Sequence, residues 1–384
     1  GSARPSVETI GEFKLIRANF NAEYGRTGGG LQIFTTRSGT NELHGAVFDY
    51  LRNDKLDARG FFQRTRPVNR QNEFGASLGG PVWLPGLYNG KNRTFFYFVY
   101  SGFRFRQGAA NALLNVLPND YRQGNFTRLG QAIYDPATTT STASGFTRTP
   151  FAGNQIPNSR FSAVSRNIVP LLPAPSSDGL FNNYVSQGRG STGANQANVK
   201  IDHQFNELNR ISGYFYIDRF TQREPEGVPG PTTQRRATTS RNVWGRITHD
   251  YVINPTTLNH INLGYTRFVT GIESYSLGQD WPNKLGLTGV NTGADSSFPR
   301  VQFLAAGYDL LGDFNGNSVV KQANNAFQLN ESLSLVRGNH NYKVGIDYRW
   351  TETNGIDNWQ ANGLFDFNAL QTGLPGNART GSAV

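Results

Sequence analysis

The residue types that most often build metal centres are sparse in this sequence. Its five histidines lie far apart along the chain, and none has a second ligand at the spacing of a metal site. They are His44, His203, His249, His260 and His340. Cysteine is absent, which excludes a thiolate site, a thiol nucleophile and a disulfide scaffold. The sequence therefore predicts no metal centre.

One stretch has part of the spacing of a calcium loop. Asp313, Asn315 and Asn317 occupy alternate positions, as the first ligands of such a loop do. Ser318 stands where the loop needs glycine, and Asn324 stands where it needs a bidentate glutamate. We therefore interpret the stretch as a turn rich in Asx residues, and calcium binding in the loops stays an open alternative.

Nucleotide binding and catalysis have little support. The run Gly28-Gly29-Gly30 lacks the Lys-Ser/Thr of a phosphate loop and the spacing of a dinucleotide fingerprint. It predicts a tight turn instead. No pair of carboxylates stands in a setting that suggests acid–base work. We expect no enzyme activity, no catalytic residue and no cofactor.

Basic residues exceed acidic ones, 37 against 27, for a formal net charge of +10. They are spread along the chain, unlike the charge blocks of a nucleic-acid-binding tail. Phe103-Arg104-Phe105-Arg106 interleaves aromatic and basic residues, as some binders of single-stranded nucleic acid do. Because this run ends a predicted strand, we favour contact with anionic lipopolysaccharide or anchoring at a membrane interface. We expect no nucleic-acid partner.

The elements that position these residues are predicted strands, in which apolar and polar residues alternate with a period of two. Apolar and polar residues alternate from Ala197 to Phe205 and again over 327–335 and 342–350. Weaker alternation covers 211–217, 243–251 and 261–265, and further strands fit at about 43–53, 72–83 and 94–106. The pattern predicts an all-β fold with about nine strands of about ten to fourteen residues, and a tenth near Leu364–Leu370. No apolar run approaches the length of a transmembrane helix.

The gaps between these strands alternate between short and long. The long ones, at about 54–71, 107–195, 220–240 and 270–323, are rich in Gly, Pro, Ser, Thr and Asn. Outer-membrane barrels have short periplasmic turns and longer extracellular loops, with strands that alternate apolar-out and polar-in. The chain is therefore predicted to form part of an antiparallel transmembrane β-barrel. We expect the loop 107–195 to be compact, with one or two helical turns over 161–170.

The same alternation assigns side chains to faces. Lys200, Asp202, Arg246 and Asp250 are expected to face the lumen, in contact with a plug or water. Glu331 interrupts an apolar face, so we expect it near an interface or at a protein contact. Aromatic residues near strand ends suit interfacial girdles, although aromatics favour strands in general. The girdle candidates are Trp83, Phe105, Phe205, Tyr251, Phe268 and Trp350.

Several stretches, taken in order along the chain, resemble the TonB-dependent outer-membrane receptors. Those that resemble the end of a plug, the crossing into the barrel and the first strands are Val7–Phe13, Ala22–Gly30, Thr36–Gly45, Phe48–Asn53, Phe74–Val82 and Gly90–Tyr97. Two more, Asn154–Phe161 and Gly338–Arg349, fit the Oar-like subgroup, whose members often carry an N-terminal carboxypeptidase-regulatory-like domain.

The resemblance implies a barrel of about 22 strands around a plug, of which this chain looks like a fragment. Residues 1–41 would be the C-terminal part of the plug, and 42–384 the N-terminal part of the barrel. The protein would take up a bulky solute across the bacterial outer membrane, with energy from the periplasmic TonB complex, whose contact region is not in this chain. Residues 107–195 and 270–323 are the candidates for solute contact, and the solute is unknown.

Two alternatives belong to other classes of protein. One is an outer-membrane barrel that acts in surface adhesion without transport. The other is a secreted β-rich binding protein, which would need no lipid-facing apolar belt.

Overall fold

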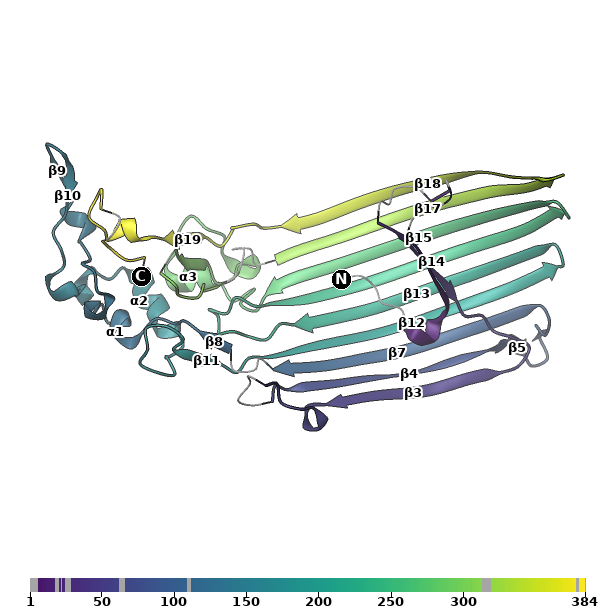
Figure 1. Ribbon diagram of the computed structural model, residues 1–384, viewed down its shortest axis with the longest axis horizontal. Helices are drawn as coiled ribbons and strands as arrows, with labels where there is room; N and C mark the ends of the chain where they lie inside the picture. The colour runs from purple at the N-terminus through teal and green to yellow at the C-terminus, as the bar shows by residue number, and fades with distance from the viewer. Residues whose placement is uncertain are drawn as a thin grey trace.

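A computed structural model describes residues 6–17, 21, 23–24, 29–61, 66–108, 112–304, 306–312, 319–377 and 380–383. Within these residues, nine long strands form one antiparallel sheet in the order β18-β17-β15-β14-β13-β12-β7-β4-β3 (Figure 1). The strands are β3 (His44–Asn53), β4 (Asn69–Pro81), β7 (Thr94–Gly108), β12 (Arg189–Asn206), β13 (Asn209–Arg223), β14 (Arg236–Asn254), β15 (Thr257–Ser274), β17 (Val319–Arg337) and β18 (His340–Asp357). The large antiparallel sheet confirms the all-β prediction.

Connections of different length leave the two ends of this sheet. At one end, here the turn end, residues 207–208, 255–256 and 338–339 join strands, and 82–93 hold the small hairpin β5 (Trp83–Leu84) and β6 (Tyr88–Asn89). At the other, the loop end, strands are joined through 54–68, 109–188, 224–235 and 275–318. Figure 1 shows the long connections gathered beyond the left end of the sheet. The short and long gaps thus alternate as the sequence predicts.

The loop domain is our name for the described residues of 112–188, 275–312 and 358–383. Its helices are α1 (Asn119–Arg122), α2 (Ala163–Ile168) and α3 (Trp281–Leu285), and its strand pairs are β8 (Ala112–Leu114) with β11 (Tyr184–Ser186), β9 (Thr140–Thr142) with β10 (Gly145–Thr147), and β16 (Arg300–Phe303) with β19 (Leu364–Phe367). Single 3-10 turns cover 127–129, 136–138, 152–154, 158–160, 169–171, 293–295 and 369–371, with two more outside it at 7–9 and 54–56. Helix α2 and the following 3-10 turn bear out the predicted helical turns.

Two clusters of buried apolar side chains hold the loop domain together. One contains Leu172, Leu285, Phe298, Val301 and Leu311, and the other contains Tyr121, Phe126 and Ile133. The first cluster draws on segments that are far apart in sequence, and Leu180 and Tyr308 from distant segments pack against the second, so the long connections fold as one packed body. Among the helices that the structure describes, none has both the length and the apolar character needed to cross a bilayer.

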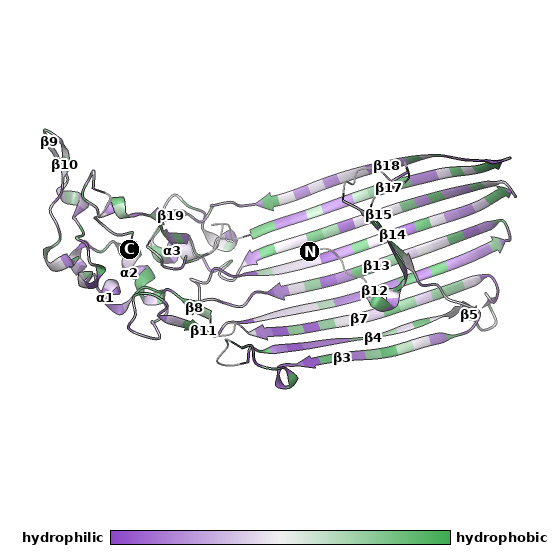
Figure 2. Ribbon diagram, viewed as in Figure 1, coloured by the Kyte–Doolittle hydropathy of each residue, from purple (hydrophilic) through white to green (hydrophobic). Residues whose placement is uncertain are grey.

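The sheet has two faces of opposite chemistry, which Figure 2 shows as stripes along the strands. Asn198 pairs with Val99 on β7 and with Tyr216 on β13, so these side chains share one face with every second residue of each strand. An N-terminal segment, the described residues of 6–43, runs across this face in Figure 1. We call it the inner face and the opposite one the outer face. The alternation predicted from 197–205 is thus the alternation of inner and outer side chains.

The N-terminal segment contains an antiparallel pair, β1 (Ile10–Ile16) and β2 (Leu31–Thr36), before it enters β3. At Gly39 its backbone passes so close to the sheet that an added Cβ would stand 2.2 Å from the carbonyl oxygen of Phe96 and 2.8 Å from that of Gly80. Only glycine fits such an approach. The segment is therefore pressed against β4 and β7 just before the chain joins the sheet.

Three expectations need correction. The tenth strand expected near Leu364–Leu370 is the short β19, which pairs in parallel with β16 in the loop domain and not with the large sheet. The long strands reach 18 and 19 residues in several cases, beyond the expected ten to fourteen. Phe105 pairs with Thr192 and Phe268 with Asn242, which places both aromatic rings on the inner face and outside any lipid-facing girdle.

Candidate functional site

The N-terminal segment contacts the inner face through polar groups. Thr9 is 1% exposed, and its Oγ1 accepts a hydrogen bond of 2.8 Å from Nδ2 of Asn198, which is 3% exposed. The hydroxyl of Tyr97 donates to the backbone carbonyl of Glu8 at 3.0 Å. Each of these buried polar groups has a partner across the interface, as burial of polar groups requires.

A second group of contacts lies nearer the turn end of β12. Nζ of Lys200 donates to Oγ of Ser38 at 2.8 Å and to the carbonyl of Thr36 at 3.4 Å. Asp202 accepts from Oγ of Ser212 at 2.5 Å and from the guanidinium of Arg210 at 3.0 Å. The sequence predicted that Lys200 and Asp202 face the lumen in contact with a plug or water, and their position on the inner face agrees with that prediction.

The other two predicted lumen residues are on the inner face as well. The Arg246 guanidinium lies over the Tyr214 ring, 5.8 Å from its centroid. Oδ1 of Asp250 lies 2.6 Å from Nδ1 of His260 on β15. Both side chains therefore bind partners within the sheet. Lys343 on β18 also forms an ion pair with Glu23 of the N-terminal segment, and the hydrogen bond from Lys343 lowers the pKa of the Glu23 carboxyl.

Glu331 is on the outer face of β17, and its Oε1 accepts a hydrogen bond of 2.5 Å from Asn259 on β15. The predicted protein contact is therefore present. Because hydrogen bonding to an amide offsets part of the cost of a charge on this face, Glu331 is compatible with an otherwise apolar surface.

The loop domain contains a cavity of about 420 Å³ between its packed segments. The lining includes Leu117, Tyr121 and Phe126 from one long connection and Leu287, Val301 and Leu311 from another. Phe365 and Phe367 of β19 close it from a third segment. The structure thus brings together the two loops 107–195 and 270–323 that the sequence proposed for solute contact. Sequence reasoning missed the contribution of β19, which carries no recognisable motif.

Two arginines border this cavity, with different partners. Arg160 forms a bidentate ion pair with Asp135, at 2.6 and 2.7 Å. Arg122 donates instead to the backbone carbonyls of Leu117 at 2.9 Å and Leu172 at 3.1 Å, and also to that of Pro173. Burial lowers the pKa of the Arg122 guanidinium, although an arginine stays protonated in a protein. The lining of the apolar cavity therefore includes a positive charge whose hydrogen-bond acceptors are neutral.

The residues first considered for metals or phosphate do not converge. Among the residues that the structure describes, no group of three His, Asp or Glu side chains could hold a metal ion. The expected turn at Asp313, Asn315, Asn317 and Ser318 lies outside the described residues, as does Gly28 of the glycine run. Asn324, the last position of the calcium spacing, is inside β17 on the inner face.

A Gly-x-Ser-x-Gly pattern is present at Gly75-Ala76-Ser77-Leu78-Gly79. These residues lie within β4 and pair with β3 on one side and β7 on the other. A nucleophile elbow needs a sharp turn between a strand and a helix. The pattern therefore has no catalytic meaning here.

Residues 35–384 match the family model of the outer membrane beta barrel domain, and the chain belongs to this family. It is accordingly a protein of the bacterial outer membrane. Over 91 residues it is 33% identical to the TonB-dependent transporter Oar of Myxococcus xanthus, a stretch that covers 22% of this chain and 9% of Oar.

Two solved structures are similar to the chain. One is the open form of the ferric-catecholate import receptor Fiu of E. coli K12, with a TM-score of 0.45 and 12% identity over 100% of this chain and 55% of Fiu. The other is the siderophore receptor PiuA of Acinetobacter baumannii, with a TM-score of 0.32 and 8% identity over 85% of this chain and 48% of PiuA. The chain thus spans about half of each.

Proposed function

We propose that this chain is part of a TonB-dependent receptor of the Oar-like subgroup, which takes up a bulky solute across the outer membrane. Residues 1–41 would be the end of its plug and 42–384 the first part of its barrel, with the loop end outside the cell. The partial similarity to a TonB-dependent transporter supports this proposal. Its remaining partners would be the TonB complex in the periplasm and the lipids of the outer membrane.

The observation that carries the proposal is the polar contact between the N-terminal segment and the inner face. Asn198 and Tyr97 each donate one hydrogen bond to the segment, and Lys200 donates two. A hydrogen bond between neutral groups contributes about 0.5–1.5 kcal/mol net, and one to a charged group such as the Lys200 ammonium about 1.5–3 kcal/mol, because water can replace either partner. An interface of this kind can separate and hydrate, as a plug must when it opens a path. An apolar interface would resist the entry of water.

The cavity of the loop domain is the proposed site of first solute contact. Its apolar and aromatic lining suits an apolar part of the solute, since such surfaces gain about 25 cal/mol per Å² when they leave water. The Arg122 charge at its border favours a solute that also has an anionic group. A substitution Phe365→Ala would enlarge the cavity and weaken capture, with the exposed Phe146 as the matched control position.

Movement of the plug can be tested without knowledge of the solute. Because this chain has no cysteine, the variant Thr9→Cys places a thiol at a buried contact of the N-terminal segment. Cells expressing the full-length protein would be treated with a membrane-impermeant maleimide, with and without TonB. We expect labelling at position 9 only in energised cells that contain TonB, since a thiol in the place of Thr9 is covered at rest.

A cysteine at the exposed Phe146 position should label equally in every strain and serves as the control. Labelling at position 9 that stays equal with and without TonB would contradict transport and favour the adhesion alternative. Recovery of the protein in the soluble fraction without detergent would favour a secreted binding protein.

A further inference from the structure

The outer face of the sheet has an apolar belt that ends abruptly toward the loop end. On β13 the outward residues Gly213, Phe215 and Ile217 are followed by Arg219, and on β14 Ile247, Gly245 and Val243 are followed by Arg241. On β15 Leu263 and Tyr265 are followed by Arg267, and on β7 Phe98 and Tyr100 precede Gly102 and Arg104. We call Arg104, Arg219, Arg241 and Arg267 the arginine row.

The arginine row contains a pair of like charges that face each other directly. Arg219 and Arg241 are register partners on adjacent strands, and both are exposed on the outer face. Opposed like charges destabilise a sheet. A second such pair, Arg70 and Arg106, joins β4 and β7 one step farther toward the loop end. In this second pair Arg70 has a partner within the chain, because its Nε donates to Oδ1 of Asp54 at 3.0 Å. The Arg219–Arg241 pair has no carboxylate partner among the described residues, so it calls for an anion from outside the chain.

The chain supplies little negative charge to the row. Arg104 and Arg267 donate to the neutral amide oxygens of Asn195, at 2.7 Å, and Asn325, at 2.9 Å. Within the described part of the chain, no carboxylate lies within ion-pair distance of any of the four arginines of the row. Their guanidinium groups therefore face outward with unused capacity for an anion, and arginine binds phosphate in bidentate geometry.

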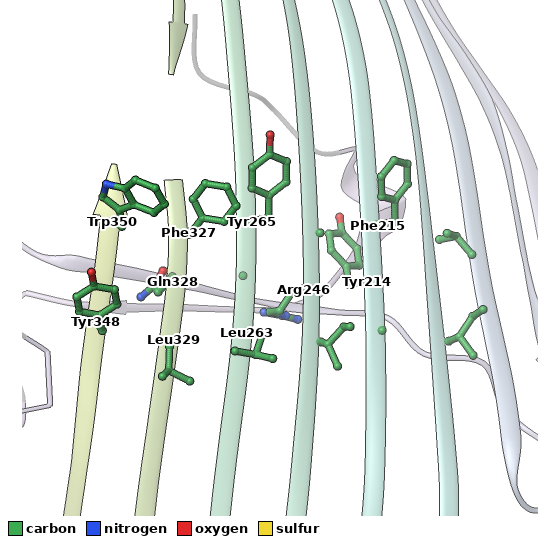
Figure 3. Close-up of a pocket in the computed structure, with 16 residues that line it drawn as sticks. Tyr214, Phe215, Arg246, Leu263, Tyr265, Phe327, Gln328, Leu329, Tyr348 and Trp350 are labelled. Atoms are coloured by element: carbon green, nitrogen blue, oxygen red, sulfur yellow. The ribbon is translucent and has the colours of Figure 1, made fainter. Parts of the chain in front are cut away.

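On the turn-end side of the arginine row, the apolar belt contains a hollow. Figure 3 shows Phe215, Tyr265, Phe327 and Trp350 side by side above a hollow of about 650 Å³. Part of its floor is bare backbone, because Gly213 and Gly245 lie diagonally to each other and a Cβ at either would meet no atom within 4 Å. From Arg241 to Gly245 is four residues, or about 13 Å along a strand. An acyl chain that hangs from a head group at the row would reach this hollow.

We infer that the arginine row and the hollow together bind one acylated, phosphate-bearing glycolipid of the outer leaflet, of the lipid A type. Its phosphates would lie between Arg219 and Arg241, and an acyl chain would fill the hollow over Gly213 and Gly245. The inference needs the loop end to face outward, but it does not depend on transport. Charge complementarity selects the phosphates, and the adjoining apolar hollow selects a lipid over a free anion.

The test measures binding of fluorescent bisphosphorylated lipid A to the delipidated, full-length protein in nonionic detergent. The variant is Arg219→Gln with Arg241→Gln. A hydrogen bond to a charged group contributes about 1.5–3 kcal/mol, so we expect the dissociation constant to rise about tenfold or more for each arginine removed. Monophosphorylated lipid A should bind the unmodified protein more weakly than the bisphosphorylated form.

The matched control is Arg52→Gln with Arg349→Gln, which removes the same charge from the inner face, outside the hollow, and should change the affinity less than twofold. Arg219→Lys with Arg241→Lys keeps the charge and loses the bidentate geometry, so it should give an intermediate affinity and shows that loss of binding is not loss of folding. Equal affinity of the Gln variant and the unmodified protein would overturn the inference. Complete displacement of lipid A by millimolar inorganic phosphate would also overturn it, since the site would then bind a free anion.

Discussion

The loop domain and the sheet bury opposite kinds of side chain. In the loop domain Phe298 and Leu285 are almost fully buried, as in a protein that folds in water. In the sheet Val344 is 72% exposed on the outer face, while Asn198 and Asp202 on the inner face are each 3% exposed. The sheet thus exposes apolar side chains on its outer face and buries polar ones on its inner face.

This difference identifies the solvent of each region. An exposed apolar surface that is continuous over many strands is rare in a soluble protein, but it is the expected surface of a strand that faces lipid. The polar inner face needs partners, and the N-terminal segment supplies some of them. The loop domain is therefore stabilised by its own buried apolar core, whereas the outer face of the sheet makes its apolar contacts with the membrane.

The largest effect is expected from a cavity in the core of the loop domain. Phe298 is fully buried and packs edge-on to Trp281, with ring centroids 5.7 Å apart. Phe298→Ala should cost the loop domain about 3–5 kcal/mol. Hydrogen exchange should show faster opening at α3 and β16, while the long strands keep their protection. Equal loss of protection in the strands would mean that the two regions do not fold independently.

A smaller loss of stability is expected from a lysine substitution on the outer face of the sheet, and two neighbouring residues of β15 allow the two faces to be compared. Leu263 is in the middle of the outer apolar belt, and Asn262 is on the inner face. A lysine at mid-depth of the lipid face costs about 2–4 kcal/mol. We therefore expect Leu263→Lys to lower the free energy of unfolding from a bilayer by this amount, and Asn262→Lys to lower it by less than half as much. Similar losses at both positions would argue that lipid does not cover the outer face.

The sequence predicted the strands best where their two faces meet different solvents. The alternation over 197–205 lies at the part of β12 that carries the outer apolar belt, and the strand was predicted there. Its first residues, from Arg189 to Gln196, carry no large apolar side chain on either face. No alternation can mark a strand whose two sides both meet polar surroundings, which explains why the predicted strands were too short.

The cavity of the loop domain could be predicted only in part. The position and the length of the long connections indicated that the loops 107–195 and 270–323, which line the cavity, would contact the solute. The parallel pairing of β16 with β19 joins residues about 64 positions apart, and no local pattern encodes such a contact. The arginine row was missed for a related reason, because its members are neighbours only through the strand register. Of the four, the sequence singled out Arg104 alone.

The smallest expected effect is electrostatic and confined to the loop domain. Arg128 donates two hydrogen bonds to the Asp120 carboxylate, at 2.6 and 2.8 Å, and these hold the pKa of Asp120 below its ordinary value. A carboxyl group whose pKa is depressed in the folded state stabilises that state above its unfolded pKa of about 3.9. The contribution is lost as the pH falls through the folded pKa. Because the pair is partly exposed, it should not exceed about 1 kcal/mol.

The measurement compares the opening free energy of the loop domain in the unmodified protein and in Asp120→Asn, by hydrogen exchange at pH 7 and at pH 2.5. We expect the variant to open more easily at pH 7, and the difference to shrink at pH 2.5, which is below the unfolded pKa of the carboxyl group. The protection of the long strands should be the same in both proteins, since their apolar belt has no share in this ion pair. A difference that persists undiminished in acid would assign the role of Asp120 to neutral hydrogen bonding and not to its charge.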